Sequence, residues 1–423
     1  MKVSLPYGKK NVDIDLDEVN ATVLEPKFVE GVADEKAGFM AACEAPIGSL
    51  PLKDLISSED KIAILIPDAT RPFPSDRVLP WLFEALPHVS TEQIVIINGT
   101  GSHRGNTSDE LIGMVGQEVY ETYRIINHDA HDPSTLAFAG KSDFGYDVYL
   151  NREFVEADKR ILMGFIEPHF MAGFSGGYKA AFPGVADVDS IMKYHSAMVV
   201  GDPLSSWGNL KDNPTQEHVR AGGRLVGADF LVNVTLNRDR AITRFFCGDV
   251  IEAHEQGCAY VKESAMVGCE KAFPIVVTSN NGFPLDQNLY QTVKGMSAAA
   301  QIVEEGGLIL VAAECADGFP EHGNYRKLLF DYPDPDSLLE AIRHPDFSVF
   351  DQWQVQLQAL ICQKARVAIQ CSLNGESLRK AHLIPVDSID AALKAELQRI
   401  GADAAVAVLP EGPVTVPYLK EVG

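Results

Sequence analysis

The stretch KIAILIPDATRPFPSDRVLPWLFEALPHVSTEQIVIINGT, residues 61–100, determines the fold class of this chain. Lys61–Asp68 and Gln93–Thr100 are short runs rich in Ile and Val, which is typical of buried strands. Asp76–Leu86 lies between them and has the period of an amphipathic helix. A strand, a helix and a strand in this order predict a βαβ unit with two parallel strands.

The same alternation of short apolar runs and longer amphipathic stretches continues along the rest of the chain. We therefore expect two α/β domains, residues 1–270 and 271–423, each with a mostly parallel sheet, and an active-site cleft between them. For the last ~20 residues the sequence does not decide the domain, because they could also pack back on the N-terminal domain. The further predicted strands are Tyr123–Asp129, Arg160–Ile166, Ile275–Ser279, Leu308–Ala313, Arg366–Cys371 and Ala404–Leu409. The further predicted helices are Ser108–Tyr120, Ile251–Met266 and Asp286–Glu305.

The composition excludes several classes of protein. With 46% hydrophobic and 22% charged residues, the 423-residue chain can bury large cores and is not expected to be disordered. A formal net charge of -23 argues against a nucleic-acid partner, which requires clustered Lys and Arg. We expect no membrane partner, since no apolar run is long enough to span a bilayer. The N-terminus lacks the apolar stretch of a secretory signal, so we expect a cytoplasmic protein.

Polar residues follow four predicted strands of the N-terminal domain, at the point where each strand ends. Ligands of open parallel sheets bind beyond the carboxyl ends of the strands, so these residues indicate one shared site and an enzymatic function. The four groups are Asp68-Ala69-Thr70-Arg71, Gly101-Ser102-His103-Arg104, Asn127-His128-Asp129 and Glu167-Pro168-His169.

The fourth strand leads into a glycine-rich loop, EPHFMAGFSGGYKA, over residues 167–180. Gly176 and Gly177 leave backbone amides open to the close approach of an anionic ligand. Lys179 adds a basic, potentially nucleophilic amine, although by position alone a solvated loop lysine is the simpler interpretation. A loop of this composition with histidines on either side indicates a cofactor site.

The histidines near this loop have simpler explanations as well as functional ones. His103 could satisfy backbone groups in a turn, and for His169 a structural and a catalytic role are equally consistent with the sequence. His195 shares a predicted helix face with Ile191 and Met198, so taken alone it is a core histidine. An imidazole with a pKa of roughly 6.5 exchanges protons well at neutral pH, and two of them on opposite sides of one carbon could serve two mirror-image substrates.

The second domain contributes a smaller set of candidates. Gln291 and Lys294 stand three positions apart on the predicted helix Asp286–Glu305 and could bind a carboxylate, or they could be a solvent-facing polar side. Trp353 is more typical of a core than of a site.

Together these motifs resemble the nickel-dependent lactate racemase family. DATRP, GTGSHRG, NHD and EPHFMAGFSGGYKA carry the resemblance in the first domain together with His195, and YQTVK and Trp353 carry it in the second. The resemblance covers nearly the whole chain. Tyr178 departs from the pattern, because it is bulkier than the Pro or Ala expected before the lysine, and it could alter the packing of the loop.

The resemblance implies a nickel-pincer nucleotide, a pyridinium mononucleotide that holds nickel through two sulfur atoms and one carbon. Lys179 maps to the lysine that tethers this cofactor covalently, and His195 maps to a nickel ligand. Soft sulfur with imidazole suits square-planar nickel. Asp68, Thr70, Gly176 and Gly177 fall where the family contacts the cofactor. Proteins that build the cofactor are then expected partners.

The reaction implied by the resemblance is racemisation or epimerisation of a short-chain 2-hydroxy acid, with lactate as the first candidate. His103 and His169 map to the two acid–base groups, hydride leaves C2 for the cofactor, and a 2-keto acid is the intermediate. Arg71, Gln291 and Lys294 would hold the substrate carboxylate, and Trp353 would line the pocket. Malate or a larger sugar acid is the alternative substrate.

Two functions from other classes remain as weaker alternatives. One is a nucleotide-binding transferase or hydrolase with a histidine base, and the other is a noncatalytic cofactor carrier. The first lacks a phosphate motif. In GTGSHRG, residues 99–105, the third glycine is one place late for GxGxxG. GFSGGYKA, residues 173–180, lacks the Gly before and the Ser or Thr after the lysine of a P-loop.

Overall fold

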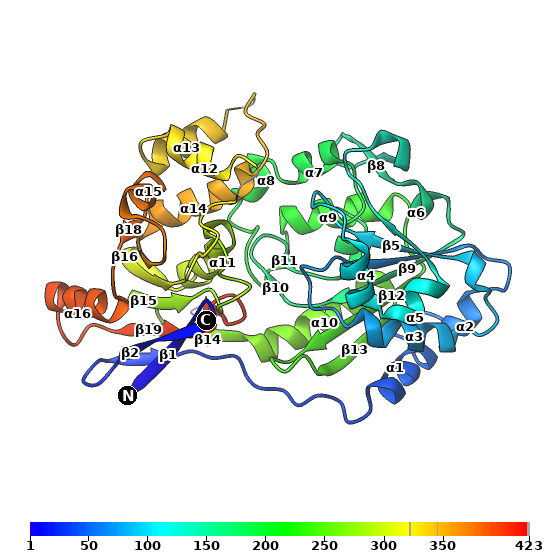
Figure 1. The fold of residues 1–423 in the computed structure, drawn as a ribbon, viewed down its shortest axis with the longest axis horizontal. Helices are drawn as coiled ribbons and strands as arrows, with labels where there is room; N and C mark the ends of the chain where they lie inside the picture. The colour runs from blue at the N-terminus through cyan, green and yellow to red at the C-terminus, as the bar shows by residue number, and fades with distance from the viewer. Residues whose placement is uncertain (321–322, 345, 421–423) are drawn as a thin grey trace. The chain divides into compact units, whose positions relative to one another are not determined.

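The computed structural model describes residues 1–320, 323–344 and 346–420, and the chain divides into two compact units (Figure 1). Unit 1 comprises Met1–Lys27, His195–Gly208 and Ala265–Gly423. Unit 2 comprises Phe28–Tyr194 and Asn209–Ser264. Within the described ranges, no helix combines the length and the apolar character needed to cross a membrane.

Unit 2 is built on a sheet with the strand order β13-β12-β9-β4-β5-β6. All neighbouring strands in this sheet are parallel except β12 and β13, which are antiparallel. The α/β class and the mostly parallel pairing predicted from the sequence are confirmed. The bounds are β4 (Ile62–Pro67), β5 (Ile94–Gly99), β6 (Arg124–Asn127), β9 (Lys159–Phe165), β12 (Phe230–Leu236) and β13 (Ile242–Gly248).

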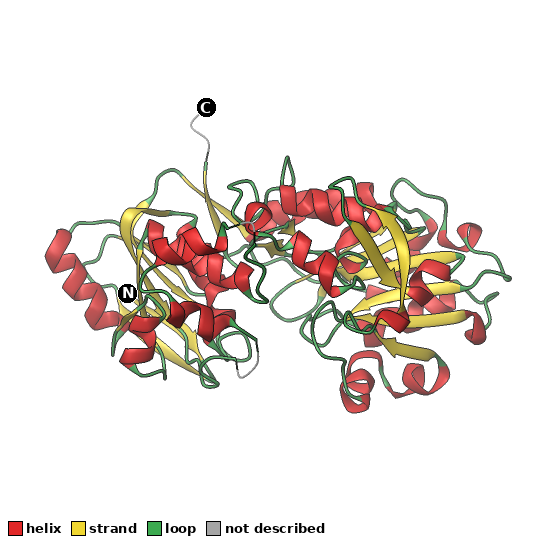
Figure 2. Cartoon of the chain, turned by 90° about the horizontal axis from the view of Figure 1, so that it is seen from above, coloured by secondary structure: helices red, strands yellow, loops and turns green. Residues whose placement is uncertain are grey.

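Helices lie on both faces of this sheet (Figure 2), so its central strands are apolar throughout and not alternating. The predicted helix Ser108–Tyr120 is in fact two helices, because Gly116 has a φ of +86° that ends the first and starts the second. The helices are α1 (Glu35–Glu44), α2 (Leu52–Leu55), α3 (Ser75–Ala85), α4 (Ser108–Val115), α5 (Gln117–Thr122), α6 (Arg152–Glu156), α7 (Val188–Tyr194), α9 (Pro214–Arg224) and α10 (Val250–Ala265). Two antiparallel hairpins add β7 (Leu136–Lys141) with β8 (Asp147–Asn151), and β10 (Pro168–His169) with β11 (Gly173–Phe174).

Unit 1 is built on a second sheet, with the order β18-β17-β16-β15-β19-β3 and parallel pairing throughout. One face of this sheet packs against α16 (Ile389–Ile400) and the antiparallel hairpin of β1 (Lys2–Tyr7) and β2 (Lys10–Asp15). Helices α11 (Leu289–Ala300) and α14 (Gln352–Lys364) also pack against its strands. The strands are β3 (Ala21–Val23), β15 (Phe273–Ser279), β16 (Val303–Ala312), β17 (Arg366–Gln370), β18 (Ile384–Pro385) and β19 (Val406–Leu409). The remaining elements are α8 (Ala197–Val200), α12 (Tyr325–Asp331), α13 (Pro335–Ile342), α15 (Gly375–Lys380), β14 (Met266–Cys269) and β20 (Val416–Leu419).

The two units differ from the ranges 1–270 and 271–423 expected from the sequence. Residues 1–27 belong to unit 1 because Ala21–Val23 pairs in parallel with Val406–Val408 at the edge of its sheet. Residues 195–208 belong to it as well, and β20 near the C-terminus pairs with β14 inside the same unit. Residues 421–423 lie outside the described residues.

The predicted helix Asp286–Glu305 is too long at both ends. Asn288 caps α11 by accepting a hydrogen bond from the Gln291 amide, so the helix begins at Leu289. It ends at Ala300, and β16 already begins at Val303. The apolar residues shared by the helix and the following strand explain the overestimate.

We predict that Ile275→Ala lowers the free energy of unfolding by about 2–5 kcal/mol, because Ile275 lies fully buried in the middle of the unit 1 sheet. The matched control is Ile384→Ala in β18 of the same sheet, where the side chain is 43% exposed. This control is expected to change the free energy by no more than about 0.5 kcal/mol. Urea unfolding measures both variants, and equal losses would contradict this packing.

Candidate active site

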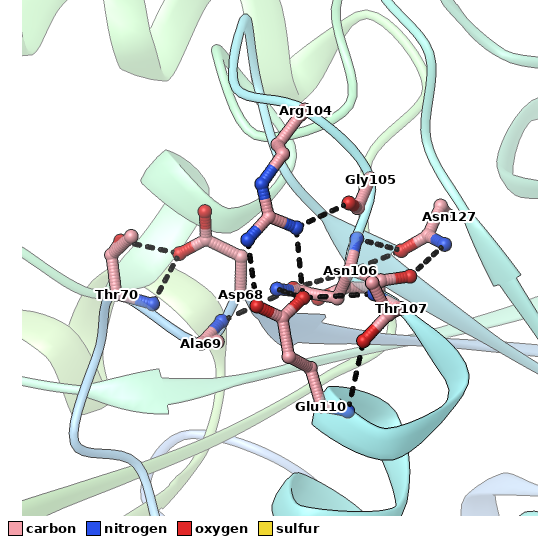
Figure 3. A network of polar contacts seen from close by, with 10 residues as sticks. Asp68, Ala69, Thr70, Arg104, Gly105, Asn106, Thr107, Glu110 and Asn127 are labelled. Carbon is pink, nitrogen blue, oxygen red and sulfur yellow. Dashed lines mark hydrogen bonds and ion pairs between the residues drawn. The ribbon is translucent and has the colours of Figure 1, made fainter.

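In unit 2, the carboxyl ends of β4 and β5 bring a carboxylate and an imidazole together. Asp68 follows β4 directly, and His103 lies in the turn after the neighbouring parallel strand β5. Nδ1 of His103 lies 2.8 Å from Oδ2 of Asp68. The Thr70 hydroxyl and amide donate to Oδ1 at 2.5 and 3.2 Å (Figure 3). The Asp68 side chain is buried, whereas that of His103 is 55% exposed.

The Asp68 carboxylate stays ionised in this position. Burial opposes its charge, but the hydrogen bond and charge of His103, the Thr70 hydroxyl and the charge of Arg71 outweigh burial, and the pKa of Asp68 lies below its ordinary value. An ionised carboxylate accepts only, so Nδ1 of His103 carries the proton that joins them. In neutral His103, Nε2 is therefore the unprotonated nitrogen, which is the form that a base requires.

Three asparagines hold the ends of β5 and β6 and the loop that follows His103, and Figure 3 labels two of them, Asn106 and Asn127. Asn98 donates to the side-chain oxygens of Asn106 and Asn127 at 2.9 and 2.8 Å. Asn127 in turn accepts from the Asn106 amide and donates to its carbonyl. Asn106 also accepts from the amide of Ala69, so the loop is joined to the segment after β4.

Arg104 is paired with a carboxylate of the helix that follows its loop. Its guanidinium grips the Glu110 carboxylate through two hydrogen bonds of 2.8 and 2.6 Å at the start of α4 (Figure 3). Those bonds, with others from Asn106 and the Thr107 amide, hold the pKa of Glu110 well below its usual range. Arg104 therefore braces the loop that carries His103.

His169 lies in the β10–β11 hairpin, and its Nδ1 accepts hydrogen bonds, whereas Nδ1 of His103 donates one. Its Nδ1 lies 3.2 Å from the amide nitrogens of both Met171 and Ala172, and its ring stacks on Phe170. Two backbone N–H donors require an acceptor at Nδ1, so neutral His169 carries its proton on Nε2. The two histidines are thus held in different tautomers.

Two buried polar side chains hold the glycine-rich loop by hydrogen bonds to its backbone. Asn233, in the middle of β12, accepts from the amide of Gly177 at 2.9 Å. Nε2 of His254, on α10, lies 2.9 Å from the carbonyl oxygen of Ser175. These bonds fix the residues immediately before Lys179, which lies in the short 3-10 helix Gly177–Ala180.

Gly176 and Gly177 are required by this close attachment. Both have positive φ, at +86° and +57°, where L side chains are strained. A Cβ would lie 2.5 Å from the Asn233 side-chain oxygen at Gly176, and 2.8 Å from the His254 ring at Gly177.

Tyr178 points into the protein. Its side chain is buried, and burial raises the pKa of its hydroxyl. The ring packs on α9 at Gly223, where an added Cβ would lie 2.5 Å from it. Gly223 therefore provides the space that the bulky Tyr178 requires.

In unit 1, His195 and Trp353 lie together. Their rings stack with centroids 4.5 Å apart at 26°, and Nε1 of Trp353 donates to the Tyr290 hydroxyl at 3.1 Å. Gln291 and Lys294 follow Tyr290 on α11, and both are partly buried.

The predicted helix through His195 is wrong. Helix α7 ends at Tyr194 and α8 begins at Ala197, so His195 lies in the break between them. Ile191 is buried whereas Met198 is 82% exposed, so they share no helix face with His195.

The comparisons with known proteins agree along the whole chain. The lactate racemase N-terminal domain matches residues 7–208, and the lactate racemase C-terminal domain matches residues 269–416. The chain belongs to the lactate racemase family. The family places it among the racemases, a class of isomerase.

Individual relatives cover nearly the same length. The lactate racemase of Thermoanaerobacterium thermosaccharolyticum is 33% identical over 97% of this chain and 97% of its own sequence. That of Lactiplantibacillus plantarum is 34% identical, with 97% and 98% covered. The structure of the T. thermosaccharolyticum lactate racemase apoprotein has a TM-score of 0.92 with complete coverage of both chains. A Thermotoga maritima protein at 18% identity, covering 91% of this chain and 97% of its own, has a TM-score of 0.69 and shares the fold.

Buried polar residues that no sequence motif identified hold the site from inside. Asn98, Asn233 and His254 are buried, and the first two interrupt otherwise apolar strands. A polar residue within such a run is the signal that could have identified them, because a buried amide requires a partner.

We predict that His254 makes the protein less stable in acid. Burial, the largest cause, lowers the pKa of His254 to about 4 in the folded chain. The unfolded chain, with a pKa of roughly 6.5, binds more protons between these values, so stability is complete above pH ~6.5 and falls towards pH ~4. His254→Gln keeps a nitrogen donor for Ser175 without a titrating group, and its free energy of unfolding should change less over this range.

Urea unfolding at a series of pH values measures this difference. The pKa of His218 is also lowered to about 4 by burial, so some pH dependence remains in the variant. Identical slopes for wild type and His254→Gln would show that His254 does not titrate in the way described.

Proposed function

We propose that the protein interconverts the two enantiomers of lactate with a nickel-pincer nucleotide attached to Lys179. The observation that carries this proposal is the pair of histidines in opposite tautomers, His103 against Asp68 and His169 against two backbone amides. Racemisation requires a group that takes a hydroxyl proton and a group that donates to the oxygen of the keto acid, and these tautomers supply one of each.

The donor groups of the chain fit such a cofactor. Among the described residues, no group of three or more His, Cys, Asp or Glu is arranged to hold a metal ion. Burial also raises the pKa of the Cys258 and Cys362 thiols, which makes them poor thiolate ligands. A metal that uses His195 must therefore bring its other ligands with it, as a cofactor with its own sulfur and carbon donors does.

The proposed attachment uses residues of the glycine-rich loop and the β4 end. Lys179 provides the covalent tether, His195 the nickel ligand, and the backbone of Gly176 and Gly177 the close approach to the cofactor, with the Gly177 amide itself donating to Asn233. Asp68 and Thr70 are proposed nucleotide contacts, since a carboxylate can accept from a ribose hydroxyl. The chemistry that the cofactor supplies when bound is reversible acceptance of hydride from C2 of the substrate.

The chain itself handles the proton and the carboxylate. In the proposed reaction, Nε2 of His103 takes the hydroxyl proton, and Asp68 stabilises the imidazolium that results. His169 would present its Nε2–H as a hydrogen bond to the oxygen of the planar keto acid, and the proton held on His103 returns to that oxygen when C2 is reduced on its other face. Arg71, Gln291 and Lys294 would hold the carboxylate, and Trp353 would limit the space beside C2. The same proposal extends to other 2-hydroxy acids, with malate or a sugar acid as the alternative substrate.

The covalent tether at Lys179 and the reaction on lactate can be tested together. Protein made together with the cofactor-building enzymes should contain nickel and a mass adduct on Lys179, and should convert either pure lactate enantiomer to the racemate. Lys179→Ala should lose the adduct and the activity. Intact-mass measurement, metal analysis and circular dichroism of the substrate provide the readouts. If the protein carries the adduct but changes the optical activity of malate and not of lactate, the substrate is malate.

The role of the Asp68–His103 pair can be tested by removing the charge of Asp68. Asp68→Asn should lower kcat by about 10²–10⁴-fold, since His103 loses the charged, acceptor-only carboxylate that fixes its tautomer and stabilises its imidazolium. The control is Arg124→Gln. It removes an exposed ion pair between Arg124, on β6 of the same sheet, and Glu153, on α6, and it should retain wild-type kcat. Equal activity of Asp68→Asn and wild type, with the adduct present in both, would remove His103 from the proposed mechanism.

A further inference from the structure

Helix α14 in unit 1 buries four glutamines in the sequence QWQVQLQ. Gln352, Gln354, Gln356 and Gln358 are each no more than 3% exposed. Trp353, Val355 and Leu357 are also buried, so this part of the helix is enclosed on all sides. Buried amides are costly without partners, and their hydrogen bonds therefore show what the helix holds in place.

Three of the glutamines attach the helix to different backbone segments of unit 1. Gln354 donates to the Tyr290 carbonyl at 2.6 Å, and Gln358 donates to the Ala381 carbonyl at 2.7 Å. The side-chain oxygen of Gln352 accepts from the amide of Val349 at the start of the helix.

Gln356 reaches the segment that follows His195. Its Nε2 donates to the carbonyl of Ala197, the first residue of α8, at 2.9 Å. Gly201 leaves room for this bond, since a Cβ there would lie 2.6 Å from Nε2 of Gln356 and 2.8 Å from the Ala197 oxygen.

The side-chain oxygen of Gln356 is buried and accepts no hydrogen bond within the described part of the chain. Burying such an atom without a partner is unfavourable. An apolar side chain of the same length would avoid that cost, so stability alone does not explain a glutamine here. The Ala197 carbonyl accepts from the Gly201 amide at 2.9 Å within its own segment, and the Gln356 amide is the donor that joins this carbonyl to α14.

The same helix also contacts the His195 ring. Trp353, one turn before Gln356, stacks on the imidazole, and the Trp353 ring is itself held by the Tyr290 hydroxyl and by the edge of Phe350 at 5.0 Å. Helix α14 thus contacts the side chain of His195 through one residue and the backbone two positions later through another.

We infer that Gln356 is a positioning residue for His195, which it holds against Trp353 so that the imidazole is already oriented for nickel. The consequence for nickel rests on the proposed function, whereas the positioning of His195 does not. Residues that orient a metal ligand commonly affect metal retention although they never touch the metal.

Two variants remove the contact from opposite sides. Gln356→Met keeps the length of the side chain and removes both polar atoms, and Gly201→Ala displaces the amide from the other element. Gly201 has a φ of -83°, which alanine adopts, so the substitution acts through the close contacts of its Cβ with Gln356 and the Ala197 carbonyl. Gln363→Ala is the control, because Gln363 lies on the same helix but is exposed and bonds to Asp336.

The first readout is the near-ultraviolet circular dichroism of the protein without cofactor. The difference between wild type and Trp353→Phe isolates the signal of the stacked indole. That signal should weaken in Gln356→Met and Gly201→Ala and persist in Gln363→Ala. Signals equal to wild type in both test variants, with all variants folded by far-ultraviolet circular dichroism, would overturn the positioning role.

The second readout is the rate of nickel release from the loaded protein to a chromogenic chelator. Gln356→Met and Gly201→Ala should release nickel about 10–100-fold faster than wild type, while the adduct on Lys179 stays intact. Release at the wild-type rate would overturn the link to nickel. If wild type itself holds neither nickel nor adduct, the proposed function fails, and the dichroism still decides whether Gln356 positions His195.

Discussion

The parallel pairing of β4 with β5 is the constraint on which the unit 2 site depends. Pro67 lies opposite Gly99, so both strands end at the same edge of the sheet, and the residues after them meet. Asp68 and His103 are 35 positions apart in the chain, yet their side chains lie 2.8 Å apart. An antiparallel pair would place the following residues at opposite ends of the sheet, and the carboxylate could not select the tautomer of the imidazole.

Buried polar side chains then hold the loops that carry the reactive groups. Asn98 lies inside an apolar strand of unit 2 and joins the loop after His103 to its neighbours. Asn233 and His254 hold the glycine-rich loop from below. Each of these groups costs free energy to bury, and each recovers part of that cost by hydrogen bonds to the loops or to the ends of the elements beside them. Loops that would otherwise be mobile are thereby fixed relative to rigid elements.

The same device recurs in unit 1 on a helix. The glutamines of α14 bind backbone carbonyls or amides of separate segments, and Trp353 on the same helix covers the ring of His195. His195 lies in a break between two short helices, where intrahelical hydrogen bonds cannot hold it. Its position therefore depends on tertiary contacts, and the buried Gln356 in the second turn of α14 provides one of them.

The sequence by itself determined the α/β class, most strands of the two sheets and the polar strand ends, because apolar runs and turn residues are local signals. It did not predict β3, β12, β13 or β18. It also determined the family, since DATRP and EPHFMAGFSGGYKA are contiguous motifs. Only the tertiary structure decided that Arg104 pairs with Glu110, that Ala21–Val23 joins the C-terminal sheet and that His195 lies outside a helix. These outcomes depend on which distant residue lies opposite each side chain, and no local pattern carries that information.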